Sequence, residues 1–319
     1  MNSLPCICCS SEANSREVTL RNGEMDDLYF CPNCGFEFFS ELLDQHIKED
    51  TFENARLASA GLEIPQEEED FNNGYAQSEE YTTRHIKKTQ SNFNVLEIGC
   101  SSGYFLKRVM DLKQAISCEG LELNPYRASR TRDRLDIPCY ESIDEIPKDR
   151  SYRFIFMFYV LEYIPEPISY IKNLIEMLSH DGKLVIYTPN QKDVLKDIWE
   201  IEEFKNFFYE RQSLNYFTTK SIQELCKNID NEEVSYKITT HQAYSPFNHL
   251  RWFFERKPKS TGIVGGDSIN HELIDLMSKE PTFSGDIGRL LEKFDQDYKN
   301  ILEDNAFGNR ILLEIDKYQ

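Results

Sequence analysis

The 319-residue sequence has no long hydrophobic run and no excess of basic residues. No apolar stretch approaches the roughly 20 residues that a membrane-spanning helix needs, which argues against a membrane span. The first residues, MNSLPCICC, show no basic start followed by an apolar segment, so we expect no signal peptide and a cytoplasmic location. Acidic residues outnumber basic ones by 55 to 36, and a net charge of −19 repels phosphate backbones. We therefore expect neither nucleic acid nor an anionic membrane as a partner.

The remaining composition is that of a folded protein. Hydrophobic residues make up 40% of the chain and aromatic residues 13%, enough for a substantial core. The length suits one large α/β domain and one small module. Nine cysteines without a visible secretory signal indicate reduced thiols and metal ligation rather than a disulfide framework.

Five of the nine cysteines lie in the first 40 residues. Four of them form two C-x-x-C pairs, Cys6 with Cys9 and Cys31 with Cys34, separated by 21 residues. This spacing predicts a structural Zn²⁺ held by four thiolates in a zinc ribbon over residues 1–40. Cys8 is an extra thiol that could compete with Cys9 for the metal. Residues 1–50 contain three basic and ten acidic side chains, which argues against RNA binding through this module.

Strand-like and helix-like stretches alternate between residues 93 and 242, a pattern typical of a parallel sheet covered by helices. A final strand is predicted over 309–318, and residues 243–308 before it, with a long helix over 283–305, are predicted to be an insertion. Residues 41–92 are predicted to form a helical linker and lid with a helix over 78–89, so that the main α/β domain spans residues 93–319. The predicted strands cover 94–99, 116–123, 137–142, 153–161, 182–189 and 232–242, and the predicted helices 104–112, 125–135, 167–179 and 219–229.

The segment VLEIGCSSGYFL places a turn bounded by Gly99 and Gly103 between a buried strand and a helix. Glycines let a backbone approach a ligand closely, and ligands of open α/β sheets bind at the carboxyl ends of the strands. Glu122 ends the next strand, 19 residues after Gly103, where a carboxylate can accept both ribose hydroxyls; the alternative is a merely polar strand end. The turn matches neither G-x-G-x-x-G nor G-x-x-x-x-G-K-[ST], so we expect a nucleoside ligand other than a dinucleotide or a P-loop nucleotide.

Three segments in order, VLEIGCSSGYFL, GLELNPYRAS and FIFMFYVLEYIPEPISYIKNLIEMLSHDGKLVIYTPN, resemble the motifs of class I S-adenosylmethionine-dependent methyltransferases over about residues 93–241. The resemblance implies a Rossmann-like, doubly wound sheet and S-adenosyl-L-methionine as cofactor. It also implies that Glu97 orients the methionine end and that Glu122 holds the ribose. The other residues implied to lie at the cofactor are Gly99, Cys100, Ser101 and Gly103 through their backbone, Ser142 near adenine, and Phe158 and Tyr159 along its side.

The zinc ribbon before this fold resembles the N-terminal ribbons of sugar-modifying methyltransferases. The resemblance implies methyl transfer to a small-molecule acceptor. The first candidate acceptor is a nucleotide sugar or glycan precursor. Two alternatives stay open: a non-catalytic protein that keeps the cofactor fold as a scaffold, and, less compatible with the charge, an RNA methyltransferase.

Methyl transfer to a hydroxyl or carbon needs a base near the carboxyl ends of the fourth and fifth strands. Relatives often carry histidine at the positions of Tyr159 and Tyr163, so an imidazole base in this chain must come from another position. His241 at the end of the sixth strand and His249 in the insertion are the candidate proton acceptors, with Tyr163 as a hydroxyl that positions the acceptor. Glu162 is a further candidate base or, alternatively, a helix cap. An aromatic cluster of the insertion forms either an acceptor wall or the insertion's own core: Tyr244, Phe247, Trp252, Phe253 and Phe254.

Overall fold

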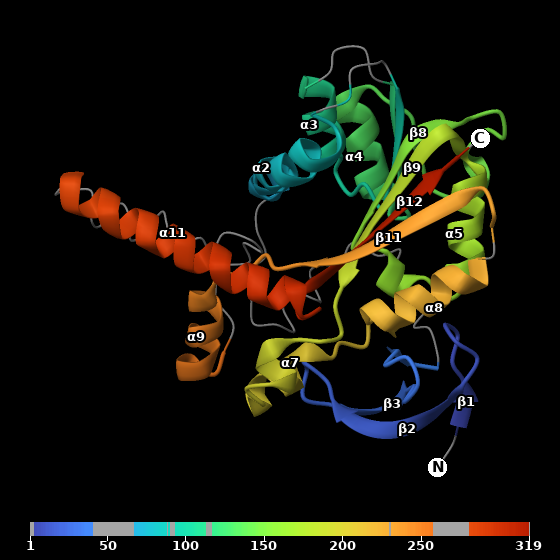
Figure 1. Ribbon diagram of the computed structural model, residues 1–319. Coiled ribbons are helices and arrows are strands. Elements are labelled where there is room, and N and C mark those ends of the chain that lie inside the picture. Colours follow the sequence, from blue (N-terminus) through green and yellow to red (C-terminus); the bar gives the residue numbers. More distant parts are fainter. Residues whose placement is uncertain are drawn as a thin grey trace.

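The computed structural model describes residues 3–40, 67–87, 89, 93–112, 117–229, 231–257 and 281–318. Two sheets organise these residues, a large one in the middle of the molecule and a small one at the N-terminus (Figure 1). None of the helices in these ranges is both long and apolar enough to span a bilayer.

The large sheet has seven strands in the order β11-β12-β9-β8-β5-β6-β7. Strands β5 to β9 pair in parallel, whereas β12 runs antiparallel to both of its neighbours. The chain moves outward from β5 first through β6 and then through β8, so the strand order reverses beside β5. This is the expected Rossmann-like, doubly wound sheet. Its strands are β5 (Asn94–Ile98), β6 (Ser117–Leu121), β7 (Cys139–Tyr140), β8 (Tyr152–Phe158), β9 (Leu178–Pro189), β11 (Val234–His241) and β12 (Arg310–Lys317).

Helices cover both faces of this sheet (Figure 1). The helices α2 (Glu67–His85), α3 (Tyr104–Leu112) and α4 (Pro125–Leu135) lie on one side, and α5 (Pro167–Glu176) and α8 (Thr219–Ile229) on the other. Pro125 occupies the first turn of α4, and the Asn124 side chain caps that helix by accepting the Arg127 N–H. Both faces of β8 are largely buried, as its continuous apolar sequence predicts.

Helix α2 differs from the expectation. It starts at Glu67 rather than at residue 78 and ends at His85 rather than at residue 89. Its first turn holds four acidic residues, which the positive end of the helix dipole stabilises, so the acidic run belongs to the helix and not to a linker. Phe71 is buried, and the Arg134 guanidinium lies 3.8 Å from the centre of its ring. The rest of the predicted linker, residues 41–66, lies outside the described residues.

The small sheet is formed mainly by residues 3–40, which we call the cysteine module. Its antiparallel strands are β1 (Ser3–Pro5), β2 (Glu12–Thr19), β3 (Met25–Phe30) and β4 (Glu37–Phe38), followed by β10 (Asn215–Tyr216). The strand β10 comes from the connection between β9 and α8, so the large domain completes the module's sheet. The Thr218 hydroxyl donates to the Cys34 carbonyl and the Asn228 amide to the Cys8 carbonyl, both at 2.7 Å. The module is therefore built into the large domain along α8.

The described residues between β11 and β12, where the insertion was predicted, include two helices. They are α9 (Pro246–Glu255) and α11 (Pro281–Asp304), and α11 extends away from the sheet (Figure 1). The predicted aromatic cluster divides: Trp252 is buried against Phe204 and Phe207, whereas the Phe254 ring is 75% exposed. Trp252 thus belongs to the core of this region. The remaining short elements are the helices α6 (Val194–Asp197) and α7 (Glu202–Phe208) and the 3-10 helices η1 (Ile143–Glu145) and η2 (Leu161–Tyr163).

Candidate functional site

The turn after β5 has a left-handed backbone at three positions. The φ angles are +73° at Gly99, +49° at Ser101 and +82° at Gly103. A Cβ atom on Gly99 would lie 2.4 Å from Val160 Cγ2, so both the angle and the space require glycine there. Ser101 is held in its unfavourable conformation by the Thr131 hydroxyl, which donates to the Ser101 carbonyl at 2.9 Å. The turn therefore exposes backbone beside the end of β5.

The Glu122 carboxylate closes this turn. One of its oxygens accepts the Ser101 N–H and the other accepts the Asn124 N–H, each at 2.9 Å. A carboxylate offers about four lone-pair positions, so two remain for further donors such as ribose hydroxyls. Glu122 is thus fixed at the carboxyl end of β6, where the sequence predicted it to act.

Glu97 is a buried carboxyl group on β5, with an exposed fraction of 2%. Its Oε2 atom has no hydrogen-bond partner among the described residues. Burial, followed by the nearby Cys139 and Glu122, raises the pKa of Glu97 well above its usual range. An orphaned buried oxygen costs roughly 1–3 kcal/mol, and a cationic ligand group would relieve that cost. The ammonium of a bound methionine moiety fits this requirement.

Other predicted cofactor residues lie around the same edge, in different roles. The Cys100 side chain is buried 3.5 Å from the Cys139 sulfur, so only its backbone can meet a ligand. The Ser142 hydroxyl accepts the Asp144 N–H and caps η1. Phe158 packs against the Tyr81 ring with 4.5 Å between ring centres. Ser142 follows the end of β7 and Phe158 ends β8, so both lie at the carboxyl edge of the parallel strands.

Sequence reasoning missed a polar network at the carboxyl edge of β8, β9 and β11. We define this edge network as Glu80, Tyr81, Arg84, Tyr159, His241, Glu303 and Arg310. Arg310 is 5% exposed and donates to both carboxylate oxygens of Glu80, at 2.7 and 2.8 Å, and to the Tyr81 hydroxyl at 2.8 Å. It also lies 3.5 Å from the Tyr159 hydroxyl. The last strand thereby ties α2 to the residue that follows β8.

Tyr159 has a left-handed backbone, with φ of +56°, directly after β8. Its N–H donates to the Tyr187 carbonyl at 2.8 Å, and its hydroxyl lies 3.4 Å from that of Tyr81. A non-glycine residue in this conformation costs free energy, and such residues cluster at functional sites. The Tyr159 ring remains 37% exposed, so it is accessible to a ligand at the edge.

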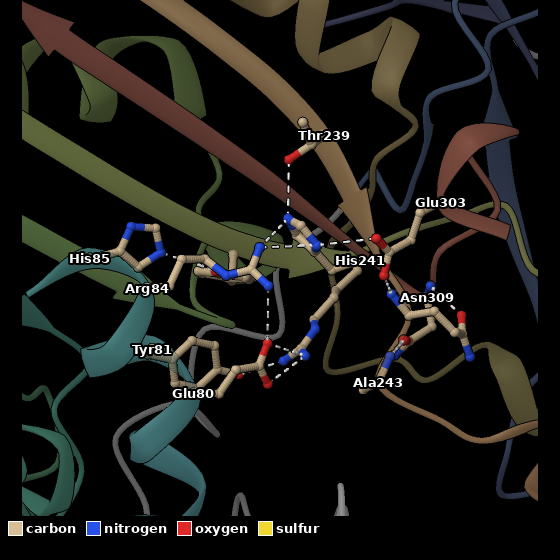
Figure 2. Close-up of polar contacts among 12 residues, drawn as sticks. Glu80, Tyr81, Arg84, His85, Thr239, His241, Ala243, Glu303 and Asn309 are labelled. Carbon is tan, nitrogen blue, oxygen red and sulfur yellow. Dashed lines mark hydrogen bonds and ion pairs between the residues drawn. The ribbon is translucent and has the colours of Figure 1, made fainter. Parts of the chain in front are cut away.

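His241 ends β11 and pairs in register with Arg310, which in turn pairs with Pro189 of β9. Its Nε2 atom lies 2.7 Å from Arg84 Nη1, and its Nδ1 atom 3.6 Å from Glu303 Oε2 (Figure 2). Arg84 is also 3.7 Å from Glu80. The predicted histidine therefore belongs to the edge network, between a cation from α2 and a carboxylate from α11.

The other predicted catalytic residues lie apart from this network. Glu162 is 3% exposed and accepts from the Thr188 hydroxyl at 3.1 Å. The alternative that it caps the next helix is wrong, because the cap position of α5 is Glu166. Tyr163 is half-buried at the end of η2. His249 is a buried residue of α9 with Nδ1 2.6 Å from the Tyr298 hydroxyl, and burial lowers its pKa to about 4.

The cysteine module brings together the four predicted metal ligands. The sulfur atoms of Cys6, Cys9, Cys31 and Cys34 all lie within 4.8 Å of one another. The Cys6–Cys34 and Cys9–Cys31 distances are 3.6 and 3.5 Å. Zinc–sulfur bonds of about 2.3 Å in a tetrahedron give sulfur–sulfur edges of about 3.8 Å, so the four thiols can hold such an ion. Cys8 is buried beside them but outside this group.

A carboxylate-closed glycine turn beside a buried carboxyl group, at the reversal point of the strand order, defines an α/β protein that binds a nucleoside ligand. A family model described as a methyltransferase domain matches residues 51–235, more than half of the chain. The chain belongs to this methyltransferase family and is an S-adenosylmethionine-dependent methyltransferase. No curated protein matches the sequence.

Several solved structures are similar to the chain. The plantazolicin methyltransferase BamL, in complex with a triazolic desmethylPZN analog and SAH, is 15% identical, with 78% of this chain and 86% of that chain covered and a TM-score of 0.47. A candidate sarcosine dimethylglycine methyltransferase from Galdieria sulphuraria is 16% identical, with 84% and 98% covered and a TM-score of 0.44. Coclaurine N-methyltransferase bound to N-methylheliamine and SAH is 11% identical, with 76% and 71% covered and a TM-score of 0.43. Likeness at this level carries no argument about the acceptor.

Replacing Glu122 tests the cofactor site. Glu122→Ala should weaken S-adenosylmethionine binding, because each lost charge-assisted hydrogen bond to a ribose hydroxyl is worth about 1.5–3 kcal/mol. Calorimetric titration of wild type and variant measures the change. Glu176→Ala is the matched control, since this exposed residue ends α5 near the amino end of β8. Equal affinities for wild type and Glu122→Ala would contradict the assignment.

Replacing Cys34 tests the metal cluster. Wild type should contain one equivalent of metal, and Cys34→Ser should lose it because only three thiolates remain. Metal analysis measures the loss, and calorimetry should show that the variant still binds S-adenosylmethionine. Cys226→Ser is the control, because Cys226 is buried in α8 outside the four-sulfur group. A well-folded wild type without metal would refute the prediction.

Proposed function

We propose that this methyltransferase acts on a small-molecule acceptor that binds at the edge network. The first candidate acceptor is a nucleotide sugar or glycan precursor. The observation that supports the proposal is the fixed Glu122 carboxylate at the turn, because its remaining lone pairs would hold a nucleoside beside β5 and β6. The reactive end of the cofactor then points toward the residues that follow β8. These residues adjoin the edge network through Tyr159.

In this proposal the chain holds S-adenosylmethionine at both ends. Glu122 accepts the ribose hydroxyls, and Glu97 receives the methionine ammonium with its orphaned oxygen. The bound cofactor supplies a methyl group on a sulfonium, and the thioether that leaves keeps the electron pair of the carbon–sulfur bond. The protein's own task is to align the acceptor and to take up its proton.

The edge network supports a polar acceptor. The hydroxyls of Tyr81 and Tyr159 lie 3.4 Å apart at the carboxyl edge, and Arg310 and Glu80 connect them to Arg84. About 37% of the Arg84 side chain is exposed. Phenol hydroxyls both donate and accept hydrogen bonds, which suits the hydroxyl groups of a sugar. The Tyr159 ring, which is 37% exposed, gives a sugar ring an apolar surface on which to pack.

The proposal includes a structural Zn²⁺ in the cysteine module. Four thiolates and no free ligand position are typical of structural rather than catalytic zinc. All nine cysteines are free thiols, which fits a reducing compartment such as the cytoplasm.

Of the two histidines that the sequence offered, the geometry favours His241 as the proton acceptor. It belongs to the edge network, whereas His249 lies against Trp199 and Tyr298. Burial keeps His249 neutral above about pH 4, so it is not the group expected to titrate near neutrality.

A panel of acceptors tests the proposed function. The purified protein should transfer labelled methyl groups from S-adenosylmethionine to at least one nucleotide sugar or glycan precursor. RNA and peptides belong in the same panel as comparison substrates. Labelling of RNA or peptide alone would contradict the proposed acceptor class but not the methyltransferase assignment.

The dependence of the rate on pH tests the base. An imidazole base gives a rate that rises through roughly pH 6 to 7, and His241→Asn should abolish this rise. His249→Asn should lower thermal stability, because it changes a buried contact, while the rise in rate with pH remains. If both variants keep the rates and pH dependence of wild type, neither histidine is the base, and Glu162 or Tyr163 becomes the next candidate.

A further inference from the structure

We infer that Glu303 is a positioning residue for the methyl-transfer reaction, because it holds the His241 imidazole in the tautomer that leaves Nε2 free to accept a proton. The inference rests on the proposed function. Glu303 lies in α11, 62 positions after His241 in the sequence, and no motif points to it. The contact exists because the insertion between β11 and β12 returns α11 to the edge of the sheet (Figure 1).

The contacts around the His241 ring determine which of its two nitrogens carries the proton in the neutral form. Nε2 lies 2.7 Å from the Arg84 guanidinium, which only donates, and 3.1 Å from the Thr239 hydroxyl, which can donate or accept. Nδ1 faces the Glu303 carboxylate at 3.6 Å (Figure 2). Arg84 Nη1 also lies 3.1 Å from Nδ1, but it is nearer to Nε2. A guanidinium only donates, so the lone pair of the neutral ring belongs on Nε2 and the proton on Nδ1, toward Glu303.

Glu303 is held in place by its other bonds. Its Oε1 accepts the Gln242 N–H at 2.8 Å, and its own carbonyl accepts from the Thr240 hydroxyl at 3.0 Å. Partial burial alone would raise the pKa of Glu303, but hydrogen bonds from His241 and the Gln242 N–H outweigh it and lower the pKa. The carboxylate is therefore ionised at neutral pH and stabilises an imidazolium beside it.

Charged groups from every neighbouring element face this pair. Arg84 and Glu80 come from α2, Arg310 from β12, and His85 lies behind Tyr187 of β9. Arg84 and Arg310 oppose protonation of His241, whereas Glu80 and Glu303 favour it. Burial lowers the pKa of His85 to about 4, so His85 adds no charge near neutrality. Of these acids in the described part of the chain, Glu303 lies nearest to the His241 ring, with Oε2 3.6 Å from Nδ1.

The proton step follows from this geometry. Arg84 covers Nε2 in the structure, and its exposed side chain also reaches Glu80. An acceptor hydroxyl would take the place of Arg84 at Nε2. Its proton would pass to that nitrogen as the oxygen bonds to the methyl carbon and the carbon–sulfur bond breaks, with its electron pair left on sulfur. The Nδ1 proton stays in place, and the Glu303 carboxylate balances the new positive charge.

The tautomer can be measured without an acceptor. Nitrogen-15 NMR of the full-length protein, with histidine labelled in the ring, distinguishes a proton on Nδ1 from one on Nε2, and His241→Asn identifies the signal. We expect neutral His241 to carry its proton on Nδ1 in wild type and Glu303→Gln to reduce the population of that tautomer. A wild-type proton on Nε2 would overturn the inference. Failure to find turnover would instead count against the proposed function.

The pH dependence of the rate gives a second readout. Glu303→Gln keeps an oxygen for the Gln242 N–H but removes the charge, so the midpoint of the rate profile should shift to lower pH by roughly one unit. Glu303→Asp, which keeps the charge, should restore part of that shift. Glu314→Gln is the matched control, because Glu314 lies at the same 3.6 Å from His85 Nδ1, and it should leave both the profile and the His241 tautomer unchanged. A Glu303→Gln profile identical to wild type would also overturn the inference.

Discussion

Two backbone N–H groups converge on the Glu122 carboxylate, and the geometry of the cofactor site depends on that convergence. The Ser101 N–H belongs to the turn after β5, and the Asn124 N–H belongs to the start of α4. One side chain thus joins the first two strand-to-helix connections of the sheet. The left-handed turn needs glycine at 99, where Val160 leaves no room for a Cβ. The shape of the turn that a ligand would meet at the end of β5 therefore depends on this carboxylate and on Gly99.

The antiparallel strand β12 supplies the other side of the site. Because β12 starts where β9 and β11 end, its first residue, Arg310, lies in register with Pro189 and His241. Arg310 then binds α2 through Glu80 and Tyr81. One buried guanidinium therefore joins α2 to the residue after β8. The register of β12 with β11 brings His241 to the same edge. A polar acceptor would meet these groups rather than an apolar wall.

The sheet and the turn could be predicted because their signals are local. Apolar runs, helical spacing and capping residues between 93 and 242 each involve neighbours in the sequence, and they predicted the sheet strands and the helices α3, α4, α5 and α8 in the right order. The short helices α6 and α7 were missed. The start of α2 was missed because its first residues are acidic and polar, and the helix dipole rather than an apolar stripe supports them. The edge network was missed because it joins Glu80, His241 and Arg310, which are far apart in the chain. The use of β10 to complete the cysteine module's sheet has the same cause: a two-residue strand carries no periodic signal.

The proposed cofactor site requires that the nucleoside of the methyl donor binds at the Glu122-closed turn. A crystal structure of the protein with S-adenosylhomocysteine would test this. Both ribose hydroxyls should lie on the Glu122 carboxylate and the amino group of the ligand beside Glu97, with the sulfur directed toward Tyr159. A ligand bound elsewhere, or a Glu122 carboxylate without contact to the ribose, would contradict it.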